Sequence, residues 1–291
     1  SLGLGTCYVG LTTNTINSTV DASISDSSVT STSGGVSVTA DSDGTVIAET
    51  LAVAIAAGLG AGVAVADAKS TINGHTQAFL GQGTTVTASG GDVILTSTSV
   101  ADASATLDAG AGTGVGLSVA SATGSARITA DTRAYVGEGV TVTARNLRVQ
   151  TVDEAADKRT TRTTTATMTA GSVGLIGATV AGATAEITGD VQAYIGPQAR
   201  ITTLGGATVV QADAGSVSTA TANGGAGGLV GVSVFNATAN VGTAGTGADP
   251  AAVEAYVGEG SVVSTGSLTI GAGGSGKATS EMTTVGVGLV G

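Results

Sequence analysis

Few residues of this chain carry side chains suited to catalysis or metal binding. The 291 residues include one histidine, His75, and one cysteine, Cys7, whereas a Ser-His-Asp triad or a zinc site needs such groups in company. His75 follows Asn73-Gly74, a pair that favours a turn, so we expect a solvent-exposed turn residue. One cysteine also allows no internal disulfide. We therefore expect a non-enzyme without catalytic, cofactor-binding or metal-binding residues.

Two carboxylates at alternate positions, in Asp41-Ser42-Asp43-Gly44, resemble the start of a calcium loop. The third acid and the distal glutamate of an EF-hand are missing. Gly273-Gly274-Ser275-Gly276-Lys277 begins like a calcium-binding nonapeptide and then offers lysine where aspartate is required. Weak calcium binding at Asp41 and Asp43, on a chain of net charge −11, is the alternative to a bare solvated turn.

Basic residues concentrate in one part of the chain. Seven of the ten lie between 127 and 162: Arg127, Arg133, Arg145, Arg148, Lys158, Arg159 and Arg162. Acids share this stretch, so we expect a mixed-charge strand face or a small excursion, with Glu154 and Lys158 at the spacing of a helical ion pair. A glycan or partner contact is the alternative. We exclude nucleic acid, because the chain is acidic and has few aromatics to stack bases.

Two further function classes remain as alternatives. A carbohydrate-active enzyme similar to a polysaccharide lyase needs clustered acids and a base, usually from loops that break a repeat. The candidates for that cluster are Asp153, Glu154 and Asp157 with Arg159 and Arg162, and the insertion from Gly242 to Pro250. Only 2% of residues are aromatic, which leaves little to stack sugars.

The second alternative is an ice-binding surface. Thr161, Thr163, Thr165, Thr167 and Thr169 would all point from one strand face, and flat threonine arrays can order water. The comparable strand of the preceding copy carries Asp102, Ser104, Thr106 and Asp108 instead. Ordinary β-propensity on a solvated face therefore explains these threonines better.

All these residues belong to a sequence unit that occurs about five times in the chain. Four stretches are nearly the same: Ala78-Phe79-Leu80-Gly81, Ala134-Tyr135-Val136-Gly137, Ala193-Tyr194-Ile195-Gly196 and Ala255-Tyr256-Val257-Gly258. A degenerate copy is Ala22-Ser23-Ile24-Ser25. The anchors at 23, 79, 135, 194 and 256 are separated by 56, 56, 59 and 62 residues. We predict a single elongated repeat domain over residues 1–291, built from about five repeats of 54–62 residues.

Composition and periodicity predict an all-β fold. With 48 Gly and no Trp, the core must be packed with Ala, Val, Thr and Gly, and Ala101 to Ala109 alternates apolar and polar residues. Gly90-Gly91, Gly205-Gly206 and Asn73-Gly74 are the expected turns. Strands that recur at one phase without helices predict a parallel β-solenoid, in which Phe79, Tyr135, Tyr194 and Tyr256 stack as a column. One wide flattened coil per repeat is favoured over two or three smaller coils.

The apolar run from Leu51 to Ala66 invites a transmembrane interpretation. Its 16 uncharged residues fall short of the roughly 20 that a spanning helix requires, and its counterparts contain Ser118, Thr179 and Ser233. We expect a buried strand pair and no membrane span. No signal peptide is visible at Ser1, so export would depend on a segment outside these residues.

The repeat unit resembles a known class of proteins. Its segments AYVGEGVTVTA, LRVQT and ATMTAGSVGLIGATVAGATAEI are similar to the repeat region of large bacterial filamentous surface adhesins, the leukotoxin-like and filamentous-haemagglutinin-like proteins. The resemblance implies a right-handed β-helical shaft at the extracellular bacterial surface that extends and presents other parts. It carries over no site residues. Expected partners are neighbouring copies or flanking repeats through the open solenoid ends, with head-to-tail self-assembly, and host or cell-surface glycans.

Overall fold

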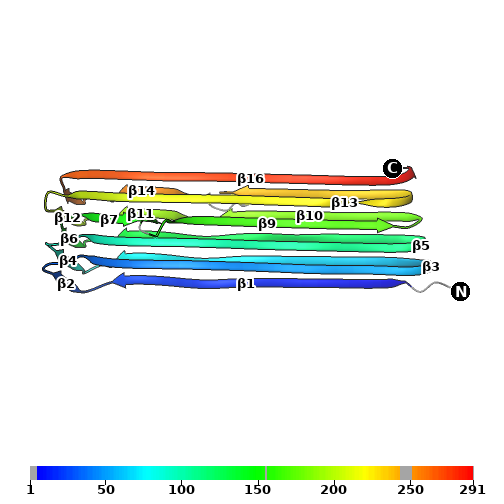
Figure 1. Cartoon of the computed structure of the whole chain (residues 1–291), viewed down its shortest axis with the longest axis horizontal. Helices are drawn as coiled ribbons and strands as arrows, with labels where there is room; N and C mark the ends of the chain where they lie inside the picture. The colour runs from blue at the N-terminus through cyan, green and yellow to red at the C-terminus, as the bar shows by residue number, and fades with distance from the viewer. Residues whose placement is uncertain (1–4, 155, 243–250, 291) are drawn as a thin grey trace.

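The computed structural model describes residues 5–154, 156–242 and 251–290. These residues form β-strands joined by short turns and contain no helix, which confirms the all-β prediction (Figure 1). The long strands are β1 (Thr6–Ile24), β3 (Val36–Leu80), β5 (Val93–Val136), β9 (Lys158–Val173), β10 (Ile176–Thr188), β13 (Ala207–Val241) and β16 (Ser267–Val290). The short strands are β2 (Ser28–Ser31), β4 (Thr85–Ala88), β6 (Thr141–Ala144), β7 (Leu147–Gln150), β8 (Val152–Asp153), β11 (Val191–Ile195), β12 (Arg200–Thr203), β14 (Val253–Val257) and β15 (Val262–Ser264).

Parallel pairing joins each repeat to the next at the same phase. Phe79 pairs with Tyr135, and Tyr194 pairs with both Tyr135 and Tyr256. Among the described strands, parallel partners are 54 to 62 residues apart, as the repeat predicts. This arrangement is consistent with a β-helix.

Changes in the pairing offset are abrupt and local. Thr96 pairs with Gln150 at an offset of 54, whereas Val100 pairs with Thr161 at an offset of 61. Ile187 pairs with Val241 at 54, and a few residues later Val191 pairs with Val253 at 62. Each increase in the pairing offset falls between two successive strands of a repeat, and the second of these strands pairs regularly at the new offset.

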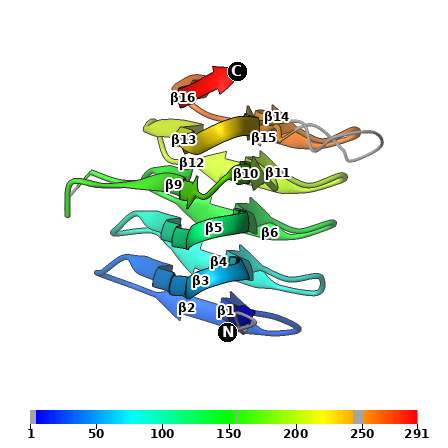
Figure 2. The ribbon, with the colours of Figure 1, turned by 90° about the vertical axis from the view of Figure 1, so that its right-hand side faces the viewer.

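The three longest strands, β3, β5 and β13, each reverse direction once, so each has two arms that face each other. In β3 the pairing register shifts between Ala56 and Leu59, and Gly58 adopts a φ of +79°. The first arm precedes this bend and the second follows it; in the third repeat the two arms are β9 and β10. We call the side where the arms meet the folded end; it faces the viewer in Figure 2. An arm such as Val36–Ala56 spans about 70 Å, and five layers stack to about 24 Å, so the longest dimension follows the strands.

The core between the arms is built from small residues, as predicted. One cluster, toward the folded end, is mostly alanine, with Leu107 and Met168 as its largest members. A second cluster contains Leu80, Leu95 and Leu147 and is closed by β4, β6 and β12. Thin packing of this kind is what a chain without large side chains allows.

Several predicted turns are strand instead. Gly90-Gly91 and Gly205-Gly206 do form turns, and Gly205 has a φ of +83°. The turn predictions at Asn73-Gly74, Asp41-Ser42-Asp43-Gly44 and Gly273 to Lys277 are wrong, because the first two stretches lie within β3 and the third within β16. Asn73, for example, pairs with Asn17 on one side and Thr129 on the other. Pairing with adjacent repeats overrides the local turn propensity.

The run from Leu51 to Ala66 crosses the folded end. Five of its alanines, Ala52, Ala54, Ala56, Ala64 and Ala66, are buried between the arms, which agrees with the expected buried strand pair. Its large residues do not follow that prediction: Leu51, Ile55 and Leu59 point to solvent. Strand alternation fixes two faces, and here the smaller residues occupy the inner one. The described part of the chain has no helix that could cross a membrane.

Candidate functional site

The predicted aromatic column exists. Ring centroids of Phe79 and Tyr135 lie 4.8 Å apart, and those of Tyr135 to Tyr194 and of Tyr194 to Tyr256 lie 4.9 Å apart. The rings are within 5° of parallel, the geometry imposed by in-register strands. Burial raises the pKa of the Tyr194 phenol to about 12, and neighbouring Tyr135 and Tyr256 add to this effect. The column therefore holds four consecutive repeats in register.

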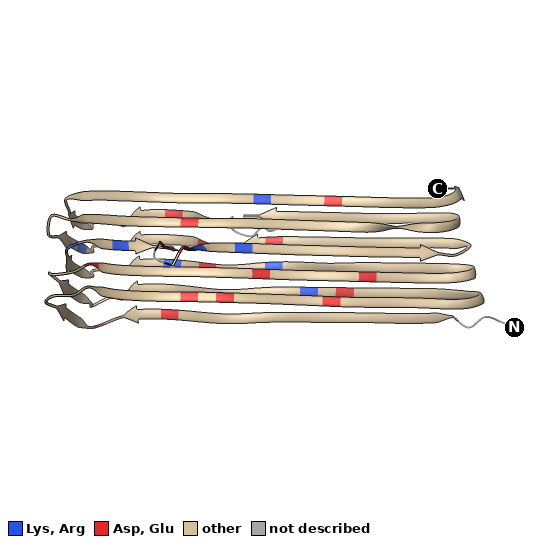
Figure 3. Cartoon of the chain, viewed as in Figure 1, with Lys and Arg blue, Asp and Glu red and all other residues tan. Residues whose placement is uncertain are grey.

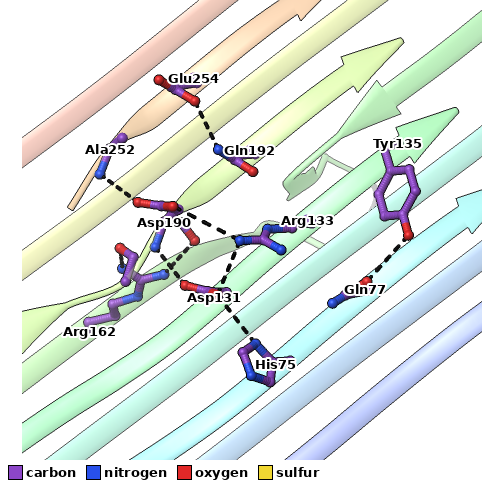
Figure 4. A network of polar contacts seen from close by, with 11 residues as sticks. His75, Gln77, Asp131, Arg133, Tyr135, Arg162, Asp190, Gln192, Ala252 and Glu254 are labelled. Atoms are coloured by element: carbon purple, nitrogen blue, oxygen red, sulfur yellow. Dashed lines mark hydrogen bonds and ion pairs between the residues drawn. The ribbon is translucent and has the colours of Figure 1, made fainter. Parts of the chain in front are cut away.

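A ladder of polar residues runs beside the column, as Figure 4 shows. His75 lies in strand β3, not in the predicted turn, and its Nδ1 is 3.3 Å from Oδ2 of Asp131 in the next repeat. Asp131 Oδ1 accepts a 2.9 Å hydrogen bond from the backbone N–H of Asp190, and Asp190 Oδ1 accepts a 3.1 Å bond from that of Ala252. Arg133 Nη2 lies 3.2 Å from Asp131. Each aspartate thus binds the repeat that follows it.

The ladder was missed at the level of sequence, although a signal exists. His75, Asp131, Asp190 and Ala252 each stand four residues before the aromatic residue, or anchor, of their own repeat. Aligning the repeats on the aromatic anchor would have brought them together. The expectation that His75 is solvent-exposed is confirmed, since 55% of its side chain is accessible.

Arg162 is buried under this ladder, with 2% of its surface exposed. Its Nη1 donates a 2.7 Å hydrogen bond to the carbonyl of Gly189, and its Nη2 donates a 3.2 Å bond to that of Asp190. Burial lowers the pKa of the guanidinium to about 10, against the opposing effect of Asp131 and Asp190. Arg162 remains charged at neutral pH and ties β9 to the turn before β11.

Several of the acids and bases proposed for a lyase-like site have partners elsewhere. Asp153 lies in β8, which pairs antiparallel with the start of β9, so the expected excursion is a short hairpin. Glu154 binds Arg148 at 3.1 Å, and Arg159 binds Asp213 at 2.9 Å. Glu154 and Lys158 form no helical ion pair, since Lys158 pairs with Asp41. Arg162 points inward, away from this cluster. The insertion after Gly242 lies outside the described residues.

The predicted mixed-charge faces are confirmed. Charged side chains pair mainly between repeats, as Arg127 does with Glu186 at 3.5 Å. Asp41, half of the candidate calcium pair, binds Lys158 and accepts a 2.8 Å hydrogen bond from Thr98. The Lys158 bond, with help from Thr98, holds the pKa of Asp41 below its usual range. No group of three or more potential metal ligands occurs in the described part of the chain.

The threonine face is present as expected. Thr163, Thr165 and Thr167 point outward from β9 and alternate with buried residues. Their partners on β5 are Asp102, Ser104 and Thr106, the residues that the repeat places there. On the other side, Thr165 and Thr167 pair with Thr219 and Thr221 of β13. Hydroxyl side chains therefore form short ladders across neighbouring repeats.

The folded end is uncharged. No Lys, Arg, Asp or Glu occurs between Glu49 and Asp67, between Asp108 and Arg127, or between Arg162 and Glu186, and Figure 3 shows this end free of charge. Large apolar side chains are exposed there: Val53, Ile55, Leu59, Val115, Leu117, Val173, Leu175, Ile176, Val180, Leu229, Val230, Val232, Val234, Val285 and Val287. Such a concentration exceeds what isolated surface residues produce and marks an interaction surface.

Comparisons with known proteins found no match for this chain. No family model matches this chain, and no curated protein and no solved structure matches it. The surfaces described above are therefore interpreted from their own chemistry.

Proposed function

We propose that this chain is a structural segment of an extracellular bacterial filament or adhesin, a right-handed parallel β-solenoid with one wide flattened coil per repeat. The observation that carries the proposal is the pairing of every repeat with the next at the same phase, through the stacked rings of Phe79, Tyr135, Tyr194 and Tyr256. The element that recurs in each repeat is the one that stacks on the next repeat, and charges pair between repeats; such an architecture suits mechanical extension.

The outermost strands support stacking on a neighbouring copy or flanking repeat. Among the described strands, β1 pairs only with the second arm of β3, and β16 pairs only with the first part of β13. Among the described residues, the coil that β16 opens is represented by its first arm alone, and β1 is a second arm. Stacked end to end, β1 of one copy would complete the coil opened by β16 of another, and the exposed backbone groups of both edges would pair.

Duplicating one repeat tests the stacking architecture. Insertion of a second copy of residues 81–136 directly after Val136 should lengthen the particle by about 4.8 Å along the stack, measured by cryo-electron microscopy. It should also raise resistance to urea, because one more interface is added. The control is an insertion of the same composition in scrambled order. A duplicated chain that unfolds, or that bulges a loop without growing, would contradict the solenoid.

Two measurements test assembly and location. Cryo-electron microscopy over a concentration series should show continuous filaments if the ends stack on each other; short isolated particles at all concentrations would reject self-assembly and leave flanking repeats as the partner. Antibodies raised against the purified chain should label intact source cells. Labelling only after permeabilisation would contradict the extracellular assignment.

A second candidate, an ice-binding surface, is supported by the hydroxyl ladders of Thr165 with Thr219 and of Thr167 with Thr221. Purified protein should then slow ice recrystallisation, and Thr167→Lys should abolish the effect. The matched control is Thr13→Lys on β1, far from these ladders. Wild-type protein without activity on ice would eliminate this candidate.

A further inference from the structure

One broad face at the folded end reverses the usual distribution of apolar residues. We call it the aliphatic face: the outward positions of the second arms nearest the bend. Its members are Cys7, Val9, Ala61, Val63, Val65, Leu117, Val119, Ser121, Ile176, Ala178, Val180, Val230, Val232 and Val234. The inward neighbours of these residues are largely small, with alanines such as Ala64, Ala120 and Ala181. Larger apolar side chains thus face solvent and smaller ones face the core.

The aliphatic face is a regular grid. Val63 pairs with Val119, and Ala178 pairs with both Val119 and Val232, so the side chains follow each other across the strands. In-register strands set a spacing of about 4.8 Å in that direction, and alternate residues of one strand are about 6.6 Å apart. On the side away from the bend, the next positions on β3, β5, β10 and β13 are polar or small: Asp67, Thr123, Gly182 and Asn236. On β1 the apolar surface continues to exposed Leu11, which pairs with Asp67.

We propose that the aliphatic face is a docking surface for the same face of a second copy of this chain. Two flat sheets of branched aliphatic side chains pack well face to face, about 10 Å apart. An identical copy presents the same spacing in both directions and no charge, so a two-fold axis through the grid matches apolar rows to apolar rows. Packing this face would bury the large residues that the alanine core leaves outside.

The composition disfavours a lipid surface as the occupant. The chain has no tryptophan, and no lysine or arginine lies among the grid or the bordering residues, although such residues anchor proteins at a membrane interface. Tyr8, between Cys7 and Val9, lies on the other face of β1 by strand alternation. A second sheet covers the side chains without requiring such anchors.

The area of the aliphatic face sets the expected affinity of dimerisation. At about 32 Å² of sheet plane for each position, the grid covers roughly 450 Å² per copy and roughly 900 Å² for the pair. This lies near the lower limit of specific interfaces, so pairing should be reversible, with a dissociation constant of about 10 µM or weaker. Addition of repeats would enlarge the face in proportion.

Sedimentation velocity over roughly 1 to 500 µM tests the proposal within the range expected of such interfaces. Wild-type chain should form a closed dimer. Val180→Lys places a charge in the middle of the grid and should weaken dimerisation at least tenfold, while Val180→Thr, which keeps the branched shape, should weaken it less. The control is Thr167→Lys, in the same repeat on the opposite outer face, which should dimerise like wild type. Circular dichroism checks that each variant is folded.

Other outcomes overturn the proposal. A chain that is monomeric over the whole range has no such interface. Open-ended growth that Val180→Lys leaves unchanged would assign association to the stacked ends, which supports the proposed function and rejects the face. Dimerisation lost equally in Val180→Lys and Thr167→Lys would also reject it. Wild-type protein that stays monomeric but floats with phosphatidylcholine vesicles would identify lipid as the occupant.

Discussion

Leu107→Ala tests which face of each strand is turned inward. Leu107 is completely buried, and its Cδ1 lies 2.8 Å from where a Cβ on Gly124 would be, so its side chain crosses the alanine layer to the second arm. Truncation removes three carbons from a thin core and leaves a cavity that Gly124 cannot fill. Substitutions of this kind cost 2–5 kcal/mol elsewhere, and we expect about 3 kcal/mol here.

The matched control is Leu51→Ala. Leu51 pairs with Asp108, the residue next to Leu107, but 64% of its surface is exposed. Only about a third of a leucine's burial is lost there, so the cost should stay below about 1 kcal/mol. Both variants are measured by urea unfolding followed by circular dichroism, with the midpoint compared at unchanged slope. Equal destabilisation by the two changes, or a larger effect of Leu51→Ala, would refute the assignment of inner and outer faces.

Three further predictions concern the column, the bend and the ladder. In a spectrophotometric titration Tyr194 should ionise near pH 12, well above the usual value of about 10. Because the folded state favours the neutral phenol, the contribution of Tyr194 to stability should be constant below about pH 10 and be lost as pH rises through 12. A single transition of all tyrosines near 10 would contradict this. Gly116→Ala should lower the free energy of unfolding in urea by more than about 2 kcal/mol, because Gly116 has a φ of +151° and the new Cβ would lie 1.9 Å from the Gly60 carbonyl oxygen. The control is Gly112→Ala, where the new Cβ meets nothing within 4 Å and stability should change by less than about 1 kcal/mol. Asp131→Ala should cost about 1–3 kcal/mol of stability, because it leaves the Asp190 N–H without its acceptor. The control is Asp102→Ala, an exposed position on the same strand, which should cost about 0.5 kcal/mol. Similar melting temperatures for these two variants would show that the ladder is dispensable.

The repeat phase was accessible from the sequence because stacking requires equivalent residues at equivalent positions. The aromatic anchors alone predicted the pairing of Phe79, Tyr135, Tyr194 and Tyr256. The outward threonines of β9 and their partners on β5 followed from the same alignment. These predictions needed only periodicity, which does not depend on side-chain detail.

Other features depend on information that one repeat does not contain. Asn73-Gly74 has the local preference of a turn, yet pairing with Asn17 and Thr129 keeps it extended. Alternation in the run around Ile55 separates two faces without saying which is inward, and in the structure the inward positions there are the alanines Ala52, Ala54 and Ala56. The partners of Lys158 and Arg159 lie in other repeats, at Asp41 and Asp213, so the helical spacing of Glu154 and Lys158 was misleading.

The abrupt changes in pairing offset show that a repeat can gain residues between its strands while the strands keep their pairing with the neighbouring repeats. Seven residues are added between Gln150 and Thr161, and eight between Val241 and Val253, relative to the neighbouring repeat, yet pairing on both sides is regular. A foreign peptide grafted between Gln150 and Thr161, where the β8–β9 hairpin already interrupts the pairing between repeats, would be held at a height fixed by the layer that bears it. Since successive layers are about 4.8 Å apart, the layer that carries an inserted loop fixes the position of that loop along the stack.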